Sequence, residues 1–311
     1  MKSKHIWLGA FVVAVLAALT TVAMLLRDPL PYFLARRSSI ATIREASTDT
    51  VGASRTQAIH IVAKSGLAVD VLLRRHRADS TRRLPLVVIL GGHVTGAEAA
   101  RLIGETPGVM IAAVSYPFTG DPRPSAATFI RELPKIRGAF LDTPPALMLA
   151  LDYLLTRPDV DSTQVDAVGV SLGAPFVVIA GSLDKRFTRV WALHGSGGSY
   201  APLESSMRRS IRFAPLRAGA AALASIVIDG PRLAPERWVA GIAPRPFIMV
   251  NATNDERMPR KSVDALYRAA AQPKELLWMS GRHIHGDART IQSLVAVVMQ
   301  RVHPNTNKLR T

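Results

Sequence analysis

Residues 165–173, with the sequence VDAVGVSLG, decide the fold predicted for this chain. An apolar run rich in valine leads straight into Gly169-Val170-Ser171-Leu172-Gly173, and small apolar residues typical of a buried helix follow to about Ser182. A sharp turn between a strand and a helix exposes a hydroxyl group, and glycines two residues to either side let neighbouring backbone approach closely. The pattern therefore predicts Ser171 as an exposed nucleophile at the turn between a strand and a helix.

Segments with strand-like and helix-like patterns alternate over the rest of the chain. The predicted strands are short apolar runs, several of them continuous as in strands buried on both faces, at residues 84–90, 109–116, 165–170, 187–193, 246–251 and 275–279. Helices are predicted at residues 146–156, 173–182, 261–271 and 288–302, the first of them capped by Thr143 and opened by Pro144 and Pro145. This alternation predicts an α/β fold with a mostly parallel central sheet and helices on both faces.

Two regions depart from the alternation. Residues 57–63 and 67–74 alternate apolar and polar positions around a Lys-Ser-Gly turn, which predicts an antiparallel hairpin at one edge of the sheet. Residues 199–240 are rich in Ala, Arg and Pro, which predicts a small cap inserted over the sheet. Its larger apolar side chains either line a substrate pocket or pack within the cap: Tyr200, Met207, Phe213 and Trp238.

A serine nucleophile needs N–H groups that stabilise the oxyanion formed during the reaction. In a site of this kind one donor is the backbone N–H of the residue after the serine, here Leu172, and the second comes from a loop after an earlier strand. That loop has the sequence Leu90-Gly91-Gly92-His93-Val94. The backbone N–H groups of Gly92 and His93 are therefore the predicted donors. An ordinary Gly-Gly turn and a catalytic imidazole at His93 are the alternatives.

The general base and the acid that orients it are expected downstream of the serine. Asp255 follows the strand at residues 246–251, and a carboxylate there can hold an imidazole and stabilise its cation. Glu256 is the alternative acid, and a role for Asp255 in a turn is also open. His283 and His285 follow the last strand, and His283 is the predicted base because it lies nearer to the strand end, with His285 as the alternative.

Three further histidines have no metal-site pattern around them. They are interpreted as ordinary surface or core residues: His60, His76 and His194. No metal and no cofactor are predicted.

The N-terminal residues 6–26 contain no charged residue and are about as long as a helix that crosses a bilayer. Lys2 and Lys4 precede them, and a short basic leader favours export of the chain on its C-terminal side. We therefore expect a single-pass signal anchor at residues 1–28, with the catalytic domain on the periplasmic or extracellular face. A cleaved signal peptide is the alternative, although its apolar core is normally shorter.

Residues 29–56 are polar and weakly patterned, which predicts a stalk or linker. The folded domain is accordingly expected at residues 57–311, with the cap at about 199–240.

The amino-acid composition indicates a globular protein and excludes some classes of partner and chemistry. Of the 311 residues, 48% are hydrophobic and 20% are charged, which is typical of a globular chain with a sizeable core. The formal net charge of +16 comes without a long basic run or a nucleic-acid-binding motif, so no nucleic-acid partner is predicted. The chain has no cysteine, which excludes disulfides and a thiol nucleophile.

Residues 157–173, RPDVDSTQVDAVGVSLG, resemble the segment before the nucleophile in the α/β-hydrolase superfamily. The resemblance includes dienelactone hydrolases, acetyl esterases and the acyl-CoA thioester hydrolase–bile acid acyltransferase group. The run Asn254-Asp255-Glu256, followed by Pro259, similarly resembles the acid loop of these families. The resemblance covers residues 57–302. One departure is the order Gly-Gly-His after residues 84–90, where related enzymes carry His-Gly-Gly.

The resemblance implies an α/β-hydrolase fold that cleaves a small-molecule carboxylic ester or thioester with a Ser-His-Asp triad, through an acyl-enzyme. Acyl transfer and amide or peptide hydrolysis on the same triad are alternatives. A catalytically inactive hydrolase fold that binds a partner at the membrane is a further one.

Overall fold

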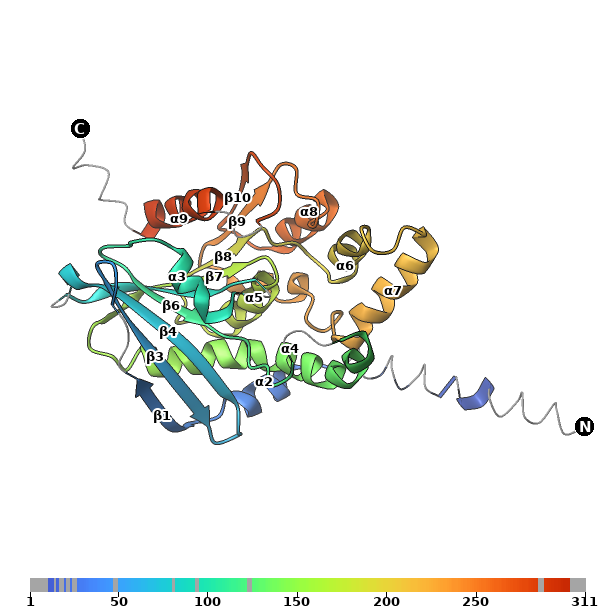
Figure 1. Cartoon of the computed structure of the whole chain (residues 1–311), viewed down its shortest axis with the longest axis horizontal. Helices are drawn as coiled ribbons and strands as arrows, with labels where there is room; N and C mark the ends of the chain where they lie inside the picture. The colour runs from blue at the N-terminus through green and yellow to red at the C-terminus, as the bar shows by residue number, and fades with distance from the viewer. Residues whose placement is uncertain are drawn as a thin grey trace, which may run out of the picture.

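The computed structural model describes residues 11–13, 15–16, 20, 23, 27–46, 50–79, 82–92, 95–121, 125–284 and 288–302. Within them, parallel strands form the centre and one side of a 10-stranded sheet (Figure 1). In spatial order these strands are β6 (Met110–Val114), β5 (Leu84–Leu90), β7 (Val160–Val170), β8 (Arg189–Leu193), β9 (Phe247–Ala252) and β10 (Lys274–Met279). Every residue of β5, β6 and β9 is buried, which explains their continuous apolar sequences.

Antiparallel strands form the other side of the sheet. β4 (Ala68–His76) pairs antiparallel with β6, and β3 (Ser54–Ala63) pairs antiparallel with β4, which confirms the predicted hairpin. β1 (Ile40–Ala46) pairs with β3 as the outermost strand, and the short β2 (Thr50–Val51) pairs with the start of β3.

Helices cover both faces of the sheet, as the alternating pattern predicted. One face packs against α4 (Ala126–Leu154), α5 (Gly173–Leu183) and α8 (Arg260–Ala269). The other face packs against α3 (Ala99–Leu102) and α9 (Ala288–Val302). Four short 3₁₀ helices also occur among the described residues: η1 (Arg77–Asp79), η2 (Gly96–Glu98), η3 (Pro235–Arg237) and η4 (Val239–Ile242).

The predicted cap, at about residues 199–240, lies between β8 and β9 in the chain. It consists of α6 (Tyr200–Met207) and α7 (Ala214–Val227), followed by η3 and η4. In Figure 1 the two helices project at the right of the molecule, away from the sheet.

Residues 30–46 do not form the expected stalk. α2 (Leu30–Arg37) packs against α4, and the side chain of Phe33 is fully buried in the main core. Arg36 forms an ion pair with Asp142 of α4 over 2.6 Å, and β1 extends the sheet. The prediction was wrong here because one buried aromatic ring and the ion pairs of Arg36 and Arg37 anchor a segment whose composition is otherwise polar.

The helix expected at residues 146–156 is longer than its sequence indicates. α4 begins at Ala126 and contains Pro134, Pro144 and Pro145 in its interior. The hydroxyl of Thr143 does not cap a helix start but donates to the carbonyl of Ala139 within α4. Buried packing of the second half of the helix, residues 146–154, outweighs the hydrogen bonds that the prolines cannot make.

Most of residues 6–26, the predicted membrane segment, lie outside the described residues. Among the described helices, none is both long and apolar enough to cross a bilayer.

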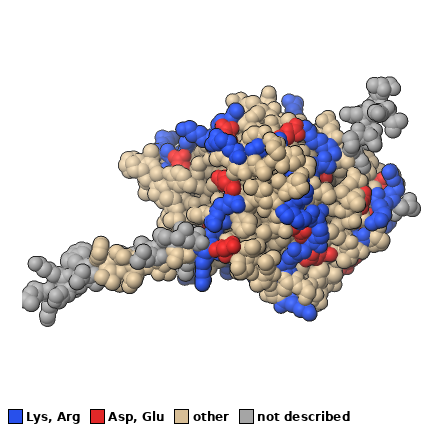
Figure 2. Space-filling model, turned by 180° about the vertical axis from the view of Figure 1, so that it is seen from behind, with Lys and Arg blue, Asp and Glu red and all other residues tan. Residues whose placement is uncertain are grey.

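The positive charge is spread over the surface. Figure 2 shows Lys and Arg side chains across the face that it presents, with fewer Asp and Glu side chains among them. Some of the arginines tie elements together through ion pairs, such as Arg75 with Asp159 at 2.8 Å and Arg189 with the buried Asp166 at 2.6 Å.

Candidate active site

Ser171 lies in the turn between β7 and α5, at the carboxyl edge of the sheet. Its φ of 53° is in the left-handed region, which costs a residue with a side chain on the order of 1–2 kcal/mol. The Ser171 N–H donates to the carbonyl of Leu193 on β8 over 2.8 Å and holds the turn in place. A Cβ at Gly173 would lie 2.2 Å from the carbonyl oxygen of Leu90, and one at Gly169 would lie 2.6 Å from the α5 backbone, so only glycine fits at either position.

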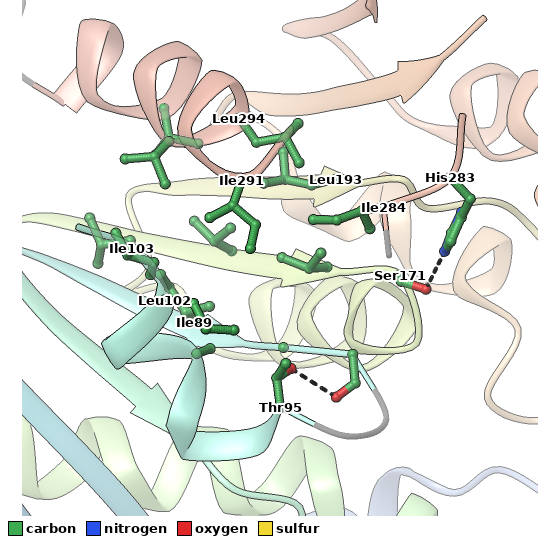
Figure 3. Close-up of a pocket in the computed structure, with 18 of the residues that line it drawn as sticks. Ile89, Thr95, Leu102, Ile103, Ser171, Leu193, His283, Ile284, Ile291 and Leu294 are labelled. Atoms are coloured by element: carbon green, nitrogen blue, oxygen red, sulfur yellow. Dashed lines mark hydrogen bonds between the residues drawn. The ribbon is translucent and has the colours of Figure 1, made fainter. Parts of the chain in front are cut away.

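His283 approaches the serine from the loop after β10. Its Nε2 atom lies 2.8 Å from Oγ of Ser171 (Figure 3), and only 3% of the residue is exposed. On the other side of the ring, Nδ1 lies 2.8 Å from Oδ2 and 3.0 Å from Oδ1 of Asp255. A carboxylate at Nδ1 favours the tautomer that keeps the proton there, which leaves Nε2 as the acceptor for the hydroxyl proton.

Asp255 lies just beyond β9 in a loop that surrounds its carboxylate with donors. The backbone N–H groups of Arg257 and Met258 each donate to Oδ1 over 2.9 Å. Burial by itself would raise the pKa of Asp255, but hydrogen bonds from His194, His283 and the Met258 amide hold that pKa well below its usual range. The carboxylate is therefore ionised at neutral pH and can stabilise a protonated His283.

His194 is a member of this cluster that was not predicted from the sequence. It directly follows the last residue of β8, has a φ of 50° and is 1% exposed. Its Nδ1 atom lies 3.2 Å from Oδ2 of Asp255, and its ring meets that of His283 edge to face, with 5.3 Å between centroids. The sequence did contain one indication of this place: His194 directly follows a predicted strand, and residues that follow parallel strands lie together at the carboxyl edge of the sheet.

Glu256, the alternative acid, contacts the backbone of the histidine loop. Its Oε2 accepts a hydrogen bond from the His283 N–H over 3.1 Å, and its Oε1 lies 3.4 Å from the guanidinium of Arg282. Glu256 thus holds the loop, while it is the carboxylate of Asp255 that lies against the imidazole of His283.

The loop after β5 brings Gly92 next to the nucleophile, where a Cβ on Gly92 would lie 3.9 Å from that of Ser171. The Tyr116 hydroxyl donates to the carbonyl of Gly91 over 2.8 Å, and burial raises the pKa of Tyr116, so it stays protonated. Because the carbonyl and the following N–H of a trans peptide point in opposite directions, the Gly92 N–H points away from Tyr116. Leu172, the other predicted donor, follows the serine directly as the N-cap residue of α5.

Two predicted site residues lie outside the described part of the chain. They are His93, the second candidate donor on the β5 loop, and His285, the alternative base.

A cavity of about 340 Å³ opens at Ser171 and extends between the sheet and α9 (Figure 3). Its polar lining side chains are Thr95, Ser171, Arg257 and His283, and the rest of its lining is apolar apart from backbone. The larger cap residues that the sequence suggested as possible lining do not border this cavity: Tyr200, Met207, Phe213 and Trp238.

His194, Asp255 and His283 also form the cluster of described side chains whose arrangement could hold a metal ion. Their ligand atoms lie within 4.8 Å of one another. The same Nδ1 and carboxylate atoms already bond to one another, and Nε2 of His283 faces the serine. An ion at this position would replace the contacts that orient the base, so the arrangement suits proton transfer better than metal binding.

No protein-family model and no curated protein sequence matches this chain. Solved structures do match its fold. Acetyl xylan esterase 1 from Thermoanaerobacterium sp. has a TM-score of 0.62 at 14% identity, over 89% of this chain and 94% of that one. The acetyl xylan esterase from Paenibacillus sp. R4 has a TM-score of 0.64 at 13% identity, over 88% and 94%. The α/β-hydrolase GrgF from Penicillium sp. sh18 has a TM-score of 0.54 at 16% identity, over 84% and 99%.

The chain has the α/β-hydrolase fold. The sheet order and the strand–turn–helix unit around Ser171 agree with this likeness, and the fold expected from residues 157–173 is confirmed. In an α/β-hydrolase fold the serine, acid and histidine follow one another along the chain, as Ser171, Asp255 and His283 do here.

Proposed function

We propose that this α/β-hydrolase is a serine ester hydrolase with Ser171 as nucleophile, His283 as general base and Asp255 as the acid that orients it. The observation that carries the proposal is the 2.8 Å separation between Nε2 of His283 and Oγ of Ser171, with Asp255 on the opposite ring nitrogen. Two structural neighbours are acetyl xylan esterases, which supports ester cleavage on this fold.

In the proposed mechanism Nε2 of His283 accepts the hydroxyl proton while Oγ of Ser171 attacks the acyl carbon of a carboxylic ester or thioester. The carbonyl oxygen becomes an oxyanion, which the backbone N–H groups of Leu172 and of Gly92 or His93 stabilise, each by about 3 kcal/mol. His283 then donates its proton to the departing alkoxide or thiolate. Water, deprotonated by the same imidazole, attacks the acyl-enzyme and releases the carboxylic acid and Ser171.

The test uses the full-length protein in membranes, a fluorophosphonate probe and a short-chain p-nitrophenyl ester. We expect the probe to modify Ser171 and expect Ser171→Ala to lose both labelling and turnover. His283→Ala should lose turnover, whereas the matched change His285→Ala should keep it. Undiminished turnover by Ser171→Ala would overturn the proposal, and an unreactive wild-type protein would indicate a binding function instead.

We also propose that residues 1–28 anchor the protein as a single pass and that the catalytic domain is exported. The uncharged stretch at residues 6–26 and the two lysines before it support this orientation. Carbonate extraction should leave the full-length protein in the membrane fraction. External protease should digest the catalytic domain of intact spheroplasts. A shortened protein in the soluble fraction would indicate cleavage, and protection from the protease would indicate the reverse orientation.

A further inference from the structure

The cavity beneath Ser171 lies on the face of the sheet that has the lighter helical cover. The opposite face carries α4, with 29 residues, and α5, with 11 residues. On the cavity side α3 has only four residues. Between α3 and α9 the side chains of Val87, Ile89, Val168 and Val170 line the cavity.

The interior of the cavity suits a hydrocarbon. Beyond the mouth its walls come from the sheet, from α3 and from α9, and they present aliphatic and methionine side chains such as Ile103, Leu294, Val298 and Met299. A hydroxyl or charged group in such a site would lose its hydrogen bonds to water without replacement, while an alkyl chain would gain from leaving water.

The length of the cavity follows from the direction of α9. This helix starts near the His283 loop, and its lining residues run from Ile291 to Met299. Eight residues of helix rise by about 12 Å. An extended peptide chain advances roughly 3.3–3.6 Å per residue, which is three backbone bonds. If an extended alkyl chain advances by a similar length per bond, about ten carbon–carbon bonds span this 12 Å.

We infer that this cavity holds the acyl chain of the substrate, which is an ester or thioester of a medium-chain fatty acid with about ten carbon atoms. The inference rests on the proposed ester hydrolysis. The acyl carbonyl lies at Ser171, the alkyl chain runs along α9, and the alcohol or thiol leaves through the mouth beside Arg257.

The test measures kcat/KM for p-nitrophenyl esters of two, four, eight, ten, twelve and sixteen carbons, with the full-length protein in lipid nanodiscs. Each methylene that enters the cavity should raise kcat/KM by up to about fourfold, to an optimum near ten carbons. Rates that fall steadily from acetate would overturn the acyl-chain inference and leave ester hydrolysis standing. A lack of turnover with every ester would overturn both.

Variants of Val298 test whether the cavity sets the preferred length of the acyl chain. Val298→Phe fills the deep end of the cavity and should move the optimum to shorter chains, with at least a tenfold fall in the ratio of decanoate to butyrate turnover. Val298→Ala enlarges the same end and should move the optimum to longer chains. Ala296→Phe places the same bulk on an exposed position of α9 and should leave the profile unchanged. An optimum that is the same in both Val298 variants and the wild-type protein contradicts the inference.

A second inference comes from the outer face of α7, which is apolar where a helix of a water-soluble domain is normally polar. Leu216, Leu223 and Ile226 are 61%, 63% and 39% exposed, and Gly219 and Ala222 lie between them on the same side. Phe213, just before the helix, is 68% exposed.

Two neighbouring features fit a lipid surface. Arg208 and Arg209 precede the helix, and each lies near a carboxylate, Glu204 at 3.2 Å and Glu256 at 4.0 Å. Their side chains are nevertheless 64% and 75% exposed, so they can also contact anionic headgroups. The chain also enters the described fold next to this helix, since Arg232, shortly after α7, donates to the carbonyl of Arg27 over 3.1 Å. Residue 27 directly follows the uncharged stretch at residues 6–26.

We propose that the Phe213–Ile226 face of α7 rests in the surface of the membrane that holds the N-terminus. Because the chain has no cysteine, single nitroxide labels can be placed at Leu216→Cys and Leu223→Cys, with Ile43→Cys on β1 as the exposed control. The full-length protein is reconstituted in vesicles of phosphatidylcholine and phosphatidylglycerol. Retained fluorophosphonate labelling confirms that each variant is folded.

The two α7 labels should collide more with oxygen and less with a water-soluble nickel complex than the label on β1. Equal nickel accessibility at all three positions would overturn the proposal. Protection that appears only in native membranes, and not in the pure lipid vesicles, would also overturn it, because a protein partner would then be the occupant.

Discussion

Nδ1 of His194 lies 3.2 Å from Oδ2 of Asp255, the same oxygen that lies 2.8 Å from Nδ1 of His283. Two buried imidazoles therefore share one carboxylate oxygen, while the other oxygen accepts the backbone N–H groups of Arg257 and Met258. With both oxygens engaged, the Asp255 carboxylate has little freedom to rotate. In the proposed mechanism His194 would therefore position Asp255, the orienting acid, and through it His283, the base.

Replacement of His194 should therefore lower kcat without removing the triad. His194→Ala loses a hydrogen bond to a charged group, which should reduce kcat by roughly ten- to a hundredfold with little change in KM. His194→Asn keeps a donor and tolerates the positive φ of 50°, so it should recover most of the rate. Steady-state kinetics of the two variants decide the matter. Equal losses in both would point to a packing role only.

Asp255→Asn should lower kcat by about four orders of magnitude, because an amide donor at Nδ1 favours the wrong tautomer of His283. The matched change Glu256→Gln affects a side chain that holds the His283 backbone, so its effect should be below about tenfold. Ester turnover by both variants, with circular dichroism to verify folding, measures the difference. If Glu256→Gln were the more damaging change, the assignment of the orienting acid would be reversed.

The pH dependence of stability should also depend on Asp255. Its pKa in the folded protein lies below the value of about 3.9 expected for the unfolded chain, so its ionised form stabilises the fold. That stabilisation is complete above about pH 4 and is lost as the pH falls through the folded pKa. The difference in unfolding free energy between wild type and Asp255→Asn should therefore shrink below about pH 4. Urea unfolding at several pH values measures it, and a difference that stays constant contradicts the assignment.

The parts of the fold that could be predicted are those that a local pattern records. The fully buried strands β5 and β9 have apolar sequences that can be recognised without a structure. The turn around Ser171 needs glycine at positions 169 and 173, and this spacing is likewise visible in the sequence. His283 could be placed because it follows the last strand.

The parts that were missed depend on contacts between distant residues. β1 has an exposed pattern because it is an edge strand, and α2 enters the core through Phe33 alone. His194 has no motif around it and gains its role only where the loops after β8 and β9 meet. The cavity likewise lies between the sheet, α3 and α9, an arrangement that no stretch of sequence records.

Phe33 provides a test of whether residues 30–46 belong to the folded domain. Its ring is fully buried, with its centroid 5.8 Å from that of Trp238, so Phe33→Ala should cost about 3–5 kcal/mol in the free energy of unfolding. Leu34→Ala, on the same helix but 55% exposed, should cost less than about 0.5 kcal/mol. Urea unfolding of both variants compares them, and similar small losses would restore the stalk interpretation.

The strained backbone of Ser171 gives a prediction about stability that is separate from catalysis. At a φ of 53° an alanine has the same steric cost as serine, whereas glycine has none, so Ser171→Gly should be more stable than Ser171→Ala by about 1 kcal/mol. Both variants lack the nucleophile, so both should be inactive. Ser293, in the regular helix α9, is the control position. Alanine stabilises a helix more than glycine does, so Ser293→Ala should be more stable than Ser293→Gly by about 1 kcal/mol. Urea unfolding of the four variants measures both differences. If glycine and alanine ranked in the same order at both positions, Ser171 would not carry backbone strain. The strain is expected because the same turn that raises the backbone energy also presents the hydroxyl to His283.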